Sequence, residues 1–367
     1  MRSYLLFFAE IAIYIFHKFL RFFKIFSSSN TSEKIGIIVF KKLGDTVFVI
    51  PAIQHLVEKY KKENIVVFCY PSSEPIIKES LDLKVIVINP NNFWLNGRVA
   101  KIAVRKEIAK AKLKVIYDLT CQVRSATAIL GLKSRTFGHN DKYCSGVYDQ
   151  FVNPLHLNYL IDRFLYIADP VTSKVPFDWD KNYPVEIDQS KKILIHPFAG
   201  WKAKEWNLKK FITLCTWIST EQNTSLIFEA GSVSQDVMIE LRNNNIDFIE
   251  TNSVLQLISE IKNCSIFVGN DSGPINIARL LGKPTFTIFG PVNPTFVLNE
   301  TKFHKKINKI IPCSPLNDNH YCHTFAGRKG CPSYECMNLL RVEDVYSAFM
   351  EYLDQIDFTI KKSSAVI

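Results

Sequence analysis

The feature that most constrains the fold is an alternation of short apolar runs with helical stretches, which occurs twice along the chain. In the first half the expected strands are Ile35 to Phe40, Ile65 to Tyr70, Val85 to Ile88 and Lys114 to Leu119. In the second half they are residues 193–196, 225–228, 247–249, 266–268 and 285–289. Such alternation is typical of βαβ units and of parallel sheets covered by helices on both faces. The sequence therefore predicts an α/β protein with two Rossmann-like domains that face a central ligand cleft.

The boundary between the two halves is a stretch without periodicity. From Asp169 to Pro184 the chain is rich in Pro, Asp, Lys and Asn, a composition that favours a linker. A chain of 367 residues can form two domains of ordinary size. The predicted organisation is an N-terminal segment at 1–30, a first domain at 31–170, a linker at 171–184, a second domain at 185–340, and a C-terminal helix and tail at 341–367. We expect the helical pattern from Val342 to Leu353 to cross back onto the first domain.

The opening 26 residues of the chain are mostly apolar or aromatic. Five of their polar residues fall on one narrow stripe of a helix, namely Ser3, Glu10, His17, Arg21 and Lys24. This pattern predicts an amphipathic helix that lies in the head-group region of an anionic membrane, with packing on the protein's own surface as the alternative. We expect no transmembrane span, because the charged residues interrupt the apolar run. We also expect no signal peptide, because no small-residue cleavage site follows. The expected location is cytoplasmic and peripheral, on the inner face of the inner membrane.

A formal net charge of +10 predicts an anionic partner. Nucleic acid, a phosphorylated glycolipid, a membrane surface and a nucleotide all satisfy this condition. The lysines are scattered rather than gathered in one basic arm, and neither an RNA-binding signature nor a Cys/His finger spacing is found. We therefore expect no nucleic-acid partner.

The first motif follows the first expected strand and reads Lys41-Lys42-Leu43-Gly44-Asp45-Thr46, with Pro51 near the start of the next helix. Gly44 permits a tight turn, and Asp45 is presented at the strand end. The Asp has two interpretations. It caps the helix by accepting a hydrogen bond from the backbone, or it acts as a general base toward an acceptor hydroxyl.

The second motif, HPFAGWKAKEW, follows the first strand of the second half. It contains His196, Gly200 and Lys204 between a strand and a helix. Small residues and two lysines in such a loop suit a diphosphate, because backbone N–H groups and ammonium charges both stabilise it. A solvated basic loop is the alternative interpretation.

The third motif, VGNDSGP, follows a buried strand and opens a helix. Gly273 permits a ligand to approach the backbone, and Pro274 fits the first helical turn. The free N–H groups at Ser272 and Gly273 would face an anion. Asp271 either caps the helix or accepts hydrogen bonds from sugar hydroxyls.

Taken in order, these motifs make the chain resemble glycosyltransferase family 9, the heptosyltransferases of lipopolysaccharide core synthesis. The resemblance covers roughly residues 34–350. It implies a GT-B fold and inverting sugar transfer without an obligatory metal or other cofactor. ADP-heptose is the implied donor, and a lipid A/core oligosaccharide is the implied acceptor.

The resemblance also implies roles for individual residues. Asp45 matches the catalytic Asp of the family, Lys204 the Lys that contacts the donor diphosphate, and Asp271 the Asp of the donor loop. His196, Gly200, Ser272 and Gly273 complete the expected donor site. Phe198 and Asn276 stand where many members carry Gly and His, which leaves the identity of the donor open.

Two further groups of residues are candidates for binding. Arg124, together with Lys42, is expected on the acceptor side, where it would pair with an acidic sugar or a lipid phosphate, unless it is a plain surface residue. Four cysteines, Cys313, Cys322, Cys331 and Cys336, lie close together in the sequence without a Cys-x-x-Cys pair. We expect plain structural thiols there, with a metal site or a redox-sensitive pair as alternatives.

The leading hypothesis is thus an inverting glycosyltransferase that works on the lipopolysaccharide or lipooligosaccharide core. One alternative is a GT-B enzyme with another donor, such as a UDP-hexose or UDP-HexNAc. A second is a non-catalytic scaffold that binds a nucleotide sugar at the membrane, and a third is a sugar-nucleotide epimerase. The joint presence of Asp45, Lys204 and Asp271 argues against the scaffold.

Overall fold

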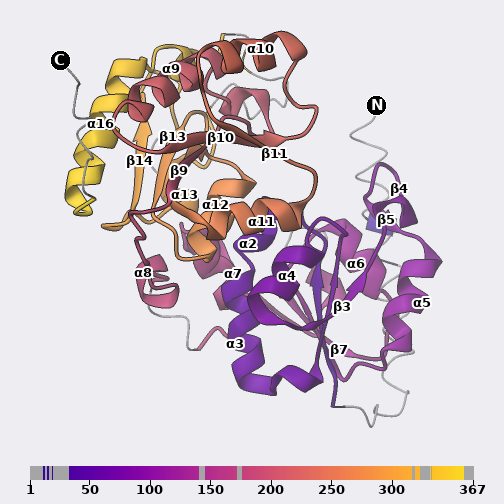
Figure 1. The fold of residues 1–367 in the computed structure, drawn as a ribbon. Coiled ribbons are helices and arrows are strands. Elements are labelled where there is room, and N and C mark those ends of the chain that lie inside the picture. The colour runs from indigo at the N-terminus through magenta and orange to yellow at the C-terminus, as the bar shows by residue number, and fades with distance from the viewer. Residues whose placement is uncertain are drawn as a thin grey trace, which may run out of the picture. The chain divides into compact units, whose positions relative to one another are not determined.

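A computed structural model of the chain describes residues 11, 12, 15, 19, 33–139, 145–171, 176–315, 319–322, 331 and 333–358. Almost all of the expected N-terminal helix, and His323 in the cysteine-rich region, lie outside these residues. The chain divides into two compact units, residues 1–176 and 177–367. The division falls inside the stretch 171–184 expected to be a linker. Each unit is a three-layer α/β structure (Figure 1).

Unit 1 is built on a six-stranded sheet in which every pairing is parallel. Its strands are β1 (Ile35–Val39), β2 (Ile65–Cys69), β3 (Lys84–Val87), β6 (Val115–Asp118), β7 (Arg135–His139) and β8 (Gln150–Val152). They are arranged in the order β3-β2-β1-β6-β7-β8. Numbered within the unit, this is 3-2-1-4-5-6, the order of a dinucleotide-binding fold.

Unit 2 repeats the same topology. Its strands are β9 (Lys192–His196), β10 (Thr224–Glu229), β11 (Phe248–Thr251), β12 (Cys264–Asn270), β13 (Thr285–Phe289) and β14 (His304–Asn308). The order β11-β10-β9-β12-β13-β14 is again 3-2-1-4-5-6, and all pairings are parallel. The predicted α/β class with two Rossmann-like units is confirmed.

The helices cover the sheets because the buried strands are apolar on both faces. In unit 1 they are α2 (Leu43–Val47), α3 (Ile50–Tyr60), α4 (Glu74–Leu81), α5 (Ile102–Lys110), α6 (Val123–Ile129) and α7 (Leu160–Ala168). Helices α5 and α6 bury Ile108 and Ile129 against the face that presents Ile38 and Phe40. Helices α3 and α7 pack against each other.

In unit 2 the longer helices supply most of the core. The helices are α8 (Trp179–Asn182), α9 (Leu208–Ser219), α10 (Gln235–Asn243), α11 (Val254–Lys262), α12 (Gly273–Leu280), α13 (Pro294–Val297), α15 (Glu335–Asn338) and α16 (Val342–Gln355). Phe211 of α9 and Phe349 of α16 lie in one buried cluster with Phe286 of β13. The final helix is therefore part of the core of unit 2, and the expectation that it crosses back onto the first domain is wrong.

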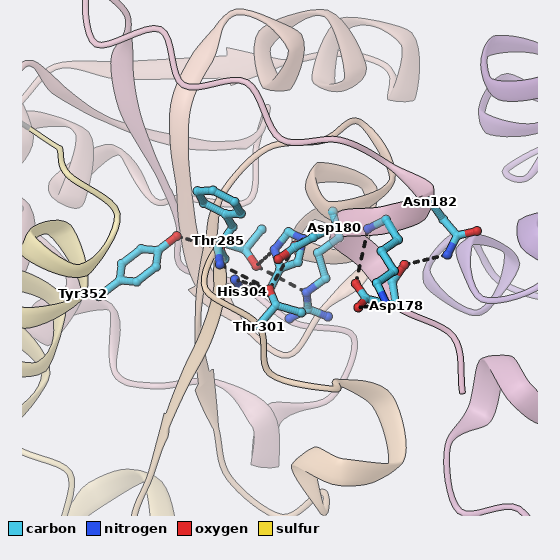
Figure 2. Close-up of polar contacts among 10 residues, drawn as sticks. Asp178, Asp180, Asn182, Thr285, Thr301, His304 and Tyr352 are labelled. Atoms are coloured by element: carbon cyan, nitrogen blue, oxygen red, sulfur yellow. Dashed lines mark hydrogen bonds and ion pairs between the residues drawn. The ribbon is translucent and has the colours of Figure 1, made fainter. Parts of the chain in front are cut away.

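The segment that opens unit 2 is fastened to its sheet by polar contacts (Figure 2). Asp180 of α8 accepts a hydrogen bond of 2.9 Å from Thr301 Oγ1 and lies 3.5 Å from His304 Nε2. His304 in turn pairs with Thr285 through Nδ1 at 3.0 Å. The Trp179 side chain beside them is fully buried. Within this cluster, burial lowers the pKa of His304 well below its ordinary value and raises that of Asp180.

Among the described residues, none of the helices has the length and apolar character required to cross a membrane.

Substitution of Gly282 tests how closely the segment that opens unit 2 packs against the rest of that unit. Its φ is +66°, and a Cβ built there would lie 2.5 Å from the carbonyl oxygen of Pro184. Gly231 has a similar φ of +78°, but a Cβ added there would meet nothing within 4 Å. Both Gly→Ala changes carry the left-handed backbone cost of about 1 kcal/mol, and only Gly282→Ala adds a clash. We expect Gly282→Ala to lower the urea midpoint clearly more than Gly231→Ala, and equal midpoints would contradict the docking.

Candidate functional site

The strand order decides where a ligand can bind in each unit. In a 3-2-1-4-5-6 sheet, connections leave in opposite directions from the first and fourth strands, which opens a crevice at their carboxyl ends. In unit 1 these strands are β1 and β6, and in unit 2 they are β9 and β12. Asp45 follows β1, and Arg124 follows β6. The second motif follows β9, and the third follows β12. All three motifs therefore lie at the crevices of their own units.

The turn after β1 is held in place by its neighbours. Lys42 is the N-cap residue of α2, and its carbonyl accepts hydrogen bonds from the backbone and the hydroxyl of Thr46 at 2.9 and 3.0 Å. The Thr46 hydroxyl also meets Ser73 Oγ at 2.7 Å, and Ser73 Oγ donates to the Lys41 carbonyl at 3.0 Å. Both hydroxyl residues are buried. The turn that carries Asp45 is therefore rigid, although Lys42 itself is exposed.

Asp45 is the third residue of α2 and is exposed to solvent. The N-cap residues of α2 and α3 are Lys42 and Val49, so Asp45 is the cap of neither helix. Within the described part of the chain its carboxylate has no hydrogen bond or ion pair to another side chain. The capping interpretation is therefore wrong, and the carboxylate is open to an incoming hydroxyl.

Lys41, to which the motif analysis gave no role, lies beside this carboxylate. Burial lowers the pKa of its ammonium group, and the nearby charge of Asp45 is the largest effect that opposes the shift. The Lys41 ammonium also lies 4.7 Å from the centre of the Phe164 ring. Charges of Asp118 and Arg124 act on the same group. Lys41 thus connects the turn after β1 electrostatically to the loop after β6.

The loop after β6 is organised by a buried carboxylate. Asp118 accepts hydrogen bonds from the backbone N–H groups of Thr120 and Cys121 at 2.9 and 3.0 Å, and from the Tyr148 hydroxyl at 2.8 Å. Burial raises its pKa despite these bonds. Thr120 Oγ1 accepts from the backbone N–H of Phe40 at 2.7 Å, which ties the loop to β1. Arg124 follows on α6, half-buried at the same end of the sheet.

In unit 2, Asn270 joins the two motif-bearing loops. The side chain is fully buried at the end of β12. Its Nδ2 donates to the Pro197 carbonyl at 2.7 Å, and its Oδ1 accepts from the Trp206 backbone N–H at 3.0 Å. Gly269, one residue earlier, lies so close to β9 that a Cβ would meet the His196 carbonyl oxygen at 2.7 Å. The loop after β9 is thereby fixed against the loop after β12.

This arrangement brings Lys204 and Asp271 together. Lys204 Nζ donates to Asp271 Oδ2 at 2.6 Å, and the two side chains are 18% and 5% exposed. Lys204 also lies over the Trp201 ring at 4.8 Å. A lysine ammonium has three N–H donors, so the contact with Asp271 orients it while other donors remain. Lys202, by contrast, is 76% exposed and pairs with Glu205 at the loop surface.

Helix α12 begins at this pair. Ser272 is its N-cap residue in an extended conformation, and Gly273 and Pro274 follow in the first turn. The Ser272 hydroxyl is buried and has no partner within the described residues. Its side chain forms no capping bond, so the N–H groups of the first turn lack that intramolecular acceptor. The end of this eight-residue helix therefore offers donors to an anion.

Two other residues expected in the donor site are His196 and Gly200. His196 is buried, stacked on Phe267 at 6.4 Å, and its Nδ1 has no partner among the described residues. Burial lowers the pKa of His196 to about 4, so the imidazole is neutral and adds no positive charge for a diphosphate. Gly200 lies in the loop before Lys204 with open space around its Cβ position.

The departures from the family pattern have structural explanations. Asn276 is buried, and its Oδ1 accepts from Arg279 Nη1 at 2.7 Å. Arg279 is itself fully buried and also donates to Thr285 and Thr287. Asn276 therefore serves the interior of unit 2. Phe198 packs against the core cluster and contacts Phe228 edge to face.

The four C-terminal cysteines meet around one cavity of about 180 Å³, which Ala203 and Gly290 also line. The eight described cysteines form no disulfide. Burial raises the pKa of Cys336 to about 11, and the neighbouring thiols add to the shift. Across the described ranges, no three His, Cys, Asp or Glu side chains are placed to hold a metal ion. The thiol and metal interpretations of this cluster both stay predictions.

Several site residues were not found from the sequence. Lys41, Asp118, Trp201 and Asn270 belong to this group. Asp118 and Asn270 each end a strand at a crevice, so the rule that ligands bind beyond strand ends could have found them. Lys41 and Trp201 act through contacts with residues far from them in the chain or across a loop, and the sequence gives no signal for that.

The buried neutral His196 predicts an acid-sensitive fold. An unfolded histidine has a pKa of about 6.5, whereas the folded pKa is about 4. Between these values the unfolded state binds a proton that the folded state does not, so the free energy of unfolding falls as the pH falls. The full difference is about 3 kcal/mol. We expect His196→Phe to lose less stability than the parent between these pH values, as measured by urea unfolding.

The exposed His156 provides the matched control. His156→Phe is expected to leave the pH dependence of the parent unchanged. If His196→Phe retains the full slope of the parent, the buried neutral imidazole is not its source.

Comparisons with known proteins agree with this geometry. Residues 160–320 match the family model of glycosyltransferase family 9 (heptosyltransferase). A lipooligosaccharide heptosyltransferase 2 of Campylobacter jejuni is 27% identical over 316 residues, which cover 83% of this chain and 93% of the relative. The relative thus extends the match from unit 2 to most of unit 1.

Two solved structures share the fold. An ADP-heptose lipopolysaccharide heptosyltransferase II of E. coli aligns with a TM-score of 0.64 at 15% identity, covering 88% of this chain and 99% of that one. A family 9 glycosyltransferase of Veillonella parvula aligns with a TM-score of 0.66 at 13% identity, covering 90% and 100%. The fold is the GT-B fold of these enzymes. With its motifs placed at the crevices of two Rossmann-like units, the chain is similar to glycosyltransferase family 9, whose family model matches residues 160–320.

Proposed function

We propose that this glycosyltransferase transfers a heptose from ADP-heptose onto the core region of lipopolysaccharide or lipooligosaccharide, with inversion at the anomeric carbon. The observation that carries the proposal is the Lys204–Asp271 pair beside the N-terminus of α12, at the crevice of unit 2. The names of the Campylobacter jejuni relative and the E. coli neighbour support both the donor and the class of acceptor.

The diphosphate of the nucleotide sugar would bind at the crevice of unit 2, which offers hydrogen-bond donors. The Lys204 ammonium supplies positive charge, and the first turn of α12 with the Ser272 hydroxyl supplies N–H and O–H groups. Negative charge accumulates on the departing ADP as the glycosidic bond breaks. Fixed donors at that position stabilise the transition state more than the ground state. Asp271 orients the ammonium and can accept a hydrogen bond from a sugar hydroxyl.

The acceptor would be activated in unit 1. Asp45 would accept the proton of the attacking hydroxyl as that oxygen bonds to the anomeric carbon on the face opposite the leaving ADP. Lys41 lies beside this carboxylate and interacts with its charge. Arg124 and Lys42 would pair with acidic groups of the acceptor, such as a lipid phosphate.

No metal is required in this scheme, because Lys204 and α12 take the part that a divalent cation has in other transferases. The enzyme would work at the cytoplasmic face of the inner membrane, where its lipid-anchored acceptor is held. Residues 1–30 would bind that anionic surface as an amphipathic helix.

Asp45→Asn tests the general base. The amide is nearly isosteric but cannot accept a proton, so we expect ADP release from ADP-heptose and a lipid A-based acceptor to fall at least about a hundredfold. Asp82→Asn is the matched control, since Asp82 is an exposed carboxylate of unit 1 outside the crevice. Undiminished activity in Asp45→Asn would refute the mechanism.

Lys204→Ala tests the donor site against Lys202→Ala, two residues away. Losing the oriented ammonium should lower kcat/KM for ADP-heptose about a hundredfold, whereas losing the exposed one should change it little. Lys204→Ala leaves the Asp271 carboxylate buried without its cation, so the urea midpoint of each variant is measured in parallel. Equal kinetic losses in the two variants would contradict the assignment.

The same assay separates the alternatives. Release of UDP from a UDP-hexose or UDP-HexNAc, with ADP-heptose inert, would keep the mechanism and replace the donor. ADP binding without turnover on any core acceptor would favour the scaffold.

A further inference from the structure

A hairpin at the edge of unit 1 exposes large apolar side chains. Strands β4 (Phe93–Trp94) and β5 (Val99–Ala100) pair in antiparallel fashion and lead into α5, and the three elements lie together in Figure 1. Trp94, Leu95 and Ile102 are 60%, 57% and 68% exposed. We call these three side chains, with the cations Arg98, Lys101 and Lys106, the hairpin patch.

The hairpin is firmly attached at its base. Phe93 is buried and contacts Phe40 and Tyr70 edge to face. The backbone N–H of Ala100 donates to Thr127 Oγ1 of α6 at 2.9 Å. The exposed tip is therefore held in a fixed position by the core of unit 1.

The tip of the hairpin is a tight turn. Leu95, Asn96 and Gly97 have φ values of 52°, 56° and 84°, and positive φ values are typical of short hairpin connections. The backbone N–H of Arg98 donates to the Trp94 carbonyl at 3.0 Å across the turn. The turn thus presents the Leu95 side chain, which is 57% exposed, at the end of the hairpin.

Positive charge surrounds the apolar tip. Residues 93–114 contain seven Lys or Arg residues and one acidic residue. Lys110 pairs with Glu107 at 2.7 Å and Lys114 with Glu33 at 2.8 Å, whereas Arg98, Lys101 and Lys106 of the patch form no ion pair with a described carboxylate. Lys101 Nζ lies over the Trp94 ring at 4.3 Å. On α5, Ile102, Lys106 and Lys110 are four residues apart and exposed, so they share one face of the helix.

We propose that the hairpin patch binds an anionic membrane surface, inserting Trp94, Leu95 and Ile102 among the head groups while the flanking lysines and arginines pair with lipid phosphates. An indole ring prefers the membrane–water interface. Basic side chains near an anionic leaflet add to the binding, and lysine stems extend along the apolar surface toward the phosphates. The proposed contact does not depend on the transfer reaction.

Fluorescence of the full chain tests the position of the contact. The chain has five tryptophans, of which Trp94 is 60% exposed, Trp201 38%, and Trp179 and Trp206 fully buried. Phosphatidylcholine vesicles that contain brominated phosphatidylglycerol should quench the tryptophan emission. We expect Trp94→Phe to lose most of this quenching and Trp201→Phe to retain it. Equal quenching in Trp94→Phe and the parent would overturn the proposal, even if the protein binds vesicles through residues 1–30.

Co-sedimentation with vesicles measures how much the hairpin patch contributes to membrane binding. Leu95→Ser/Ile102→Ser should lower partitioning onto anionic vesicles about tenfold, a loss expected from two exposed apolar side chains. Ile239→Ser/Leu255→Ser is the matched control, because these residues of unit 2 are 52% and 58% exposed and should leave partitioning unchanged. Equal losses in both pairs would contradict a localised contact.

Two further outcomes count against the proposal. Shielding of Trp94 from a soluble quencher in the absence of vesicles would show that another part of the chain, or a second copy, covers the patch. Undiminished binding to pure phosphatidylcholine would remove the role of the charges. Transfer to a deacylated, water-soluble acceptor is measured alongside and should be unaffected by Leu95→Ser/Ile102→Ser, so failure of this proposal is distinguishable from failure of the proposed activity.

Discussion

The close approach of β9 and β12 is the constraint on which the candidate site of unit 2 depends. These strands pair in register as far as His196 and Gly269, and a side chain at Gly269 would collide with the His196 carbonyl. Asn270, one residue further, bonds to backbone groups on both sides of Lys204. Because the two strands are adjacent, two loops nearly seventy residues apart in sequence share one edge. The 2.6 Å contact of Lys204 with Asp271 follows from that adjacency.

The two units use one topology for opposite electrostatic tasks. In unit 2 the crevice collects an ammonium, a hydroxyl that has no partner among the described residues, and a helix N-terminus, all of which favour developing negative charge. In unit 1 the crevice presents an exposed carboxylate beside a half-buried lysine. In the proposed inverting transfer, the crevice of unit 1 would supply the base for the acceptor, and the crevice of unit 2 would hold the leaving group. Since strand order is the same in both, the difference lies in the loops.

Strands and helices were predicted correctly from the sequence where the local pattern of apolar residues is strong. The apolar strands at the centre of each sheet were predicted within about two residues, because strands buried on both faces read as apolar runs. Strands β7, β8 and β14 were missed, since their sequences RTFGH, QFV and HKKIN are short or polar and lie toward one edge. The hairpin of β4 and β5 was missed for the same reason. The final helix was predicted as a helix but assigned to the wrong unit, because periodicity gives the apolar face of a helix and not the surface that covers it.

The sequence by itself determined the class of fold, the repetition of the Rossmann pattern, and the identity of Asp45, Lys204 and Asp271 as candidates, because turn-forming glycines, strand runs and motif order are local properties. Only the tertiary structure decided what surrounds those residues. It placed Asp45 outside any cap position, gave Lys204 the Asp271 carboxylate as a partner, made His196 a neutral buried group, and gathered four cysteines around one cavity. Such outcomes depend on burial and on contacts between distant segments, which no local pattern of side chains encodes.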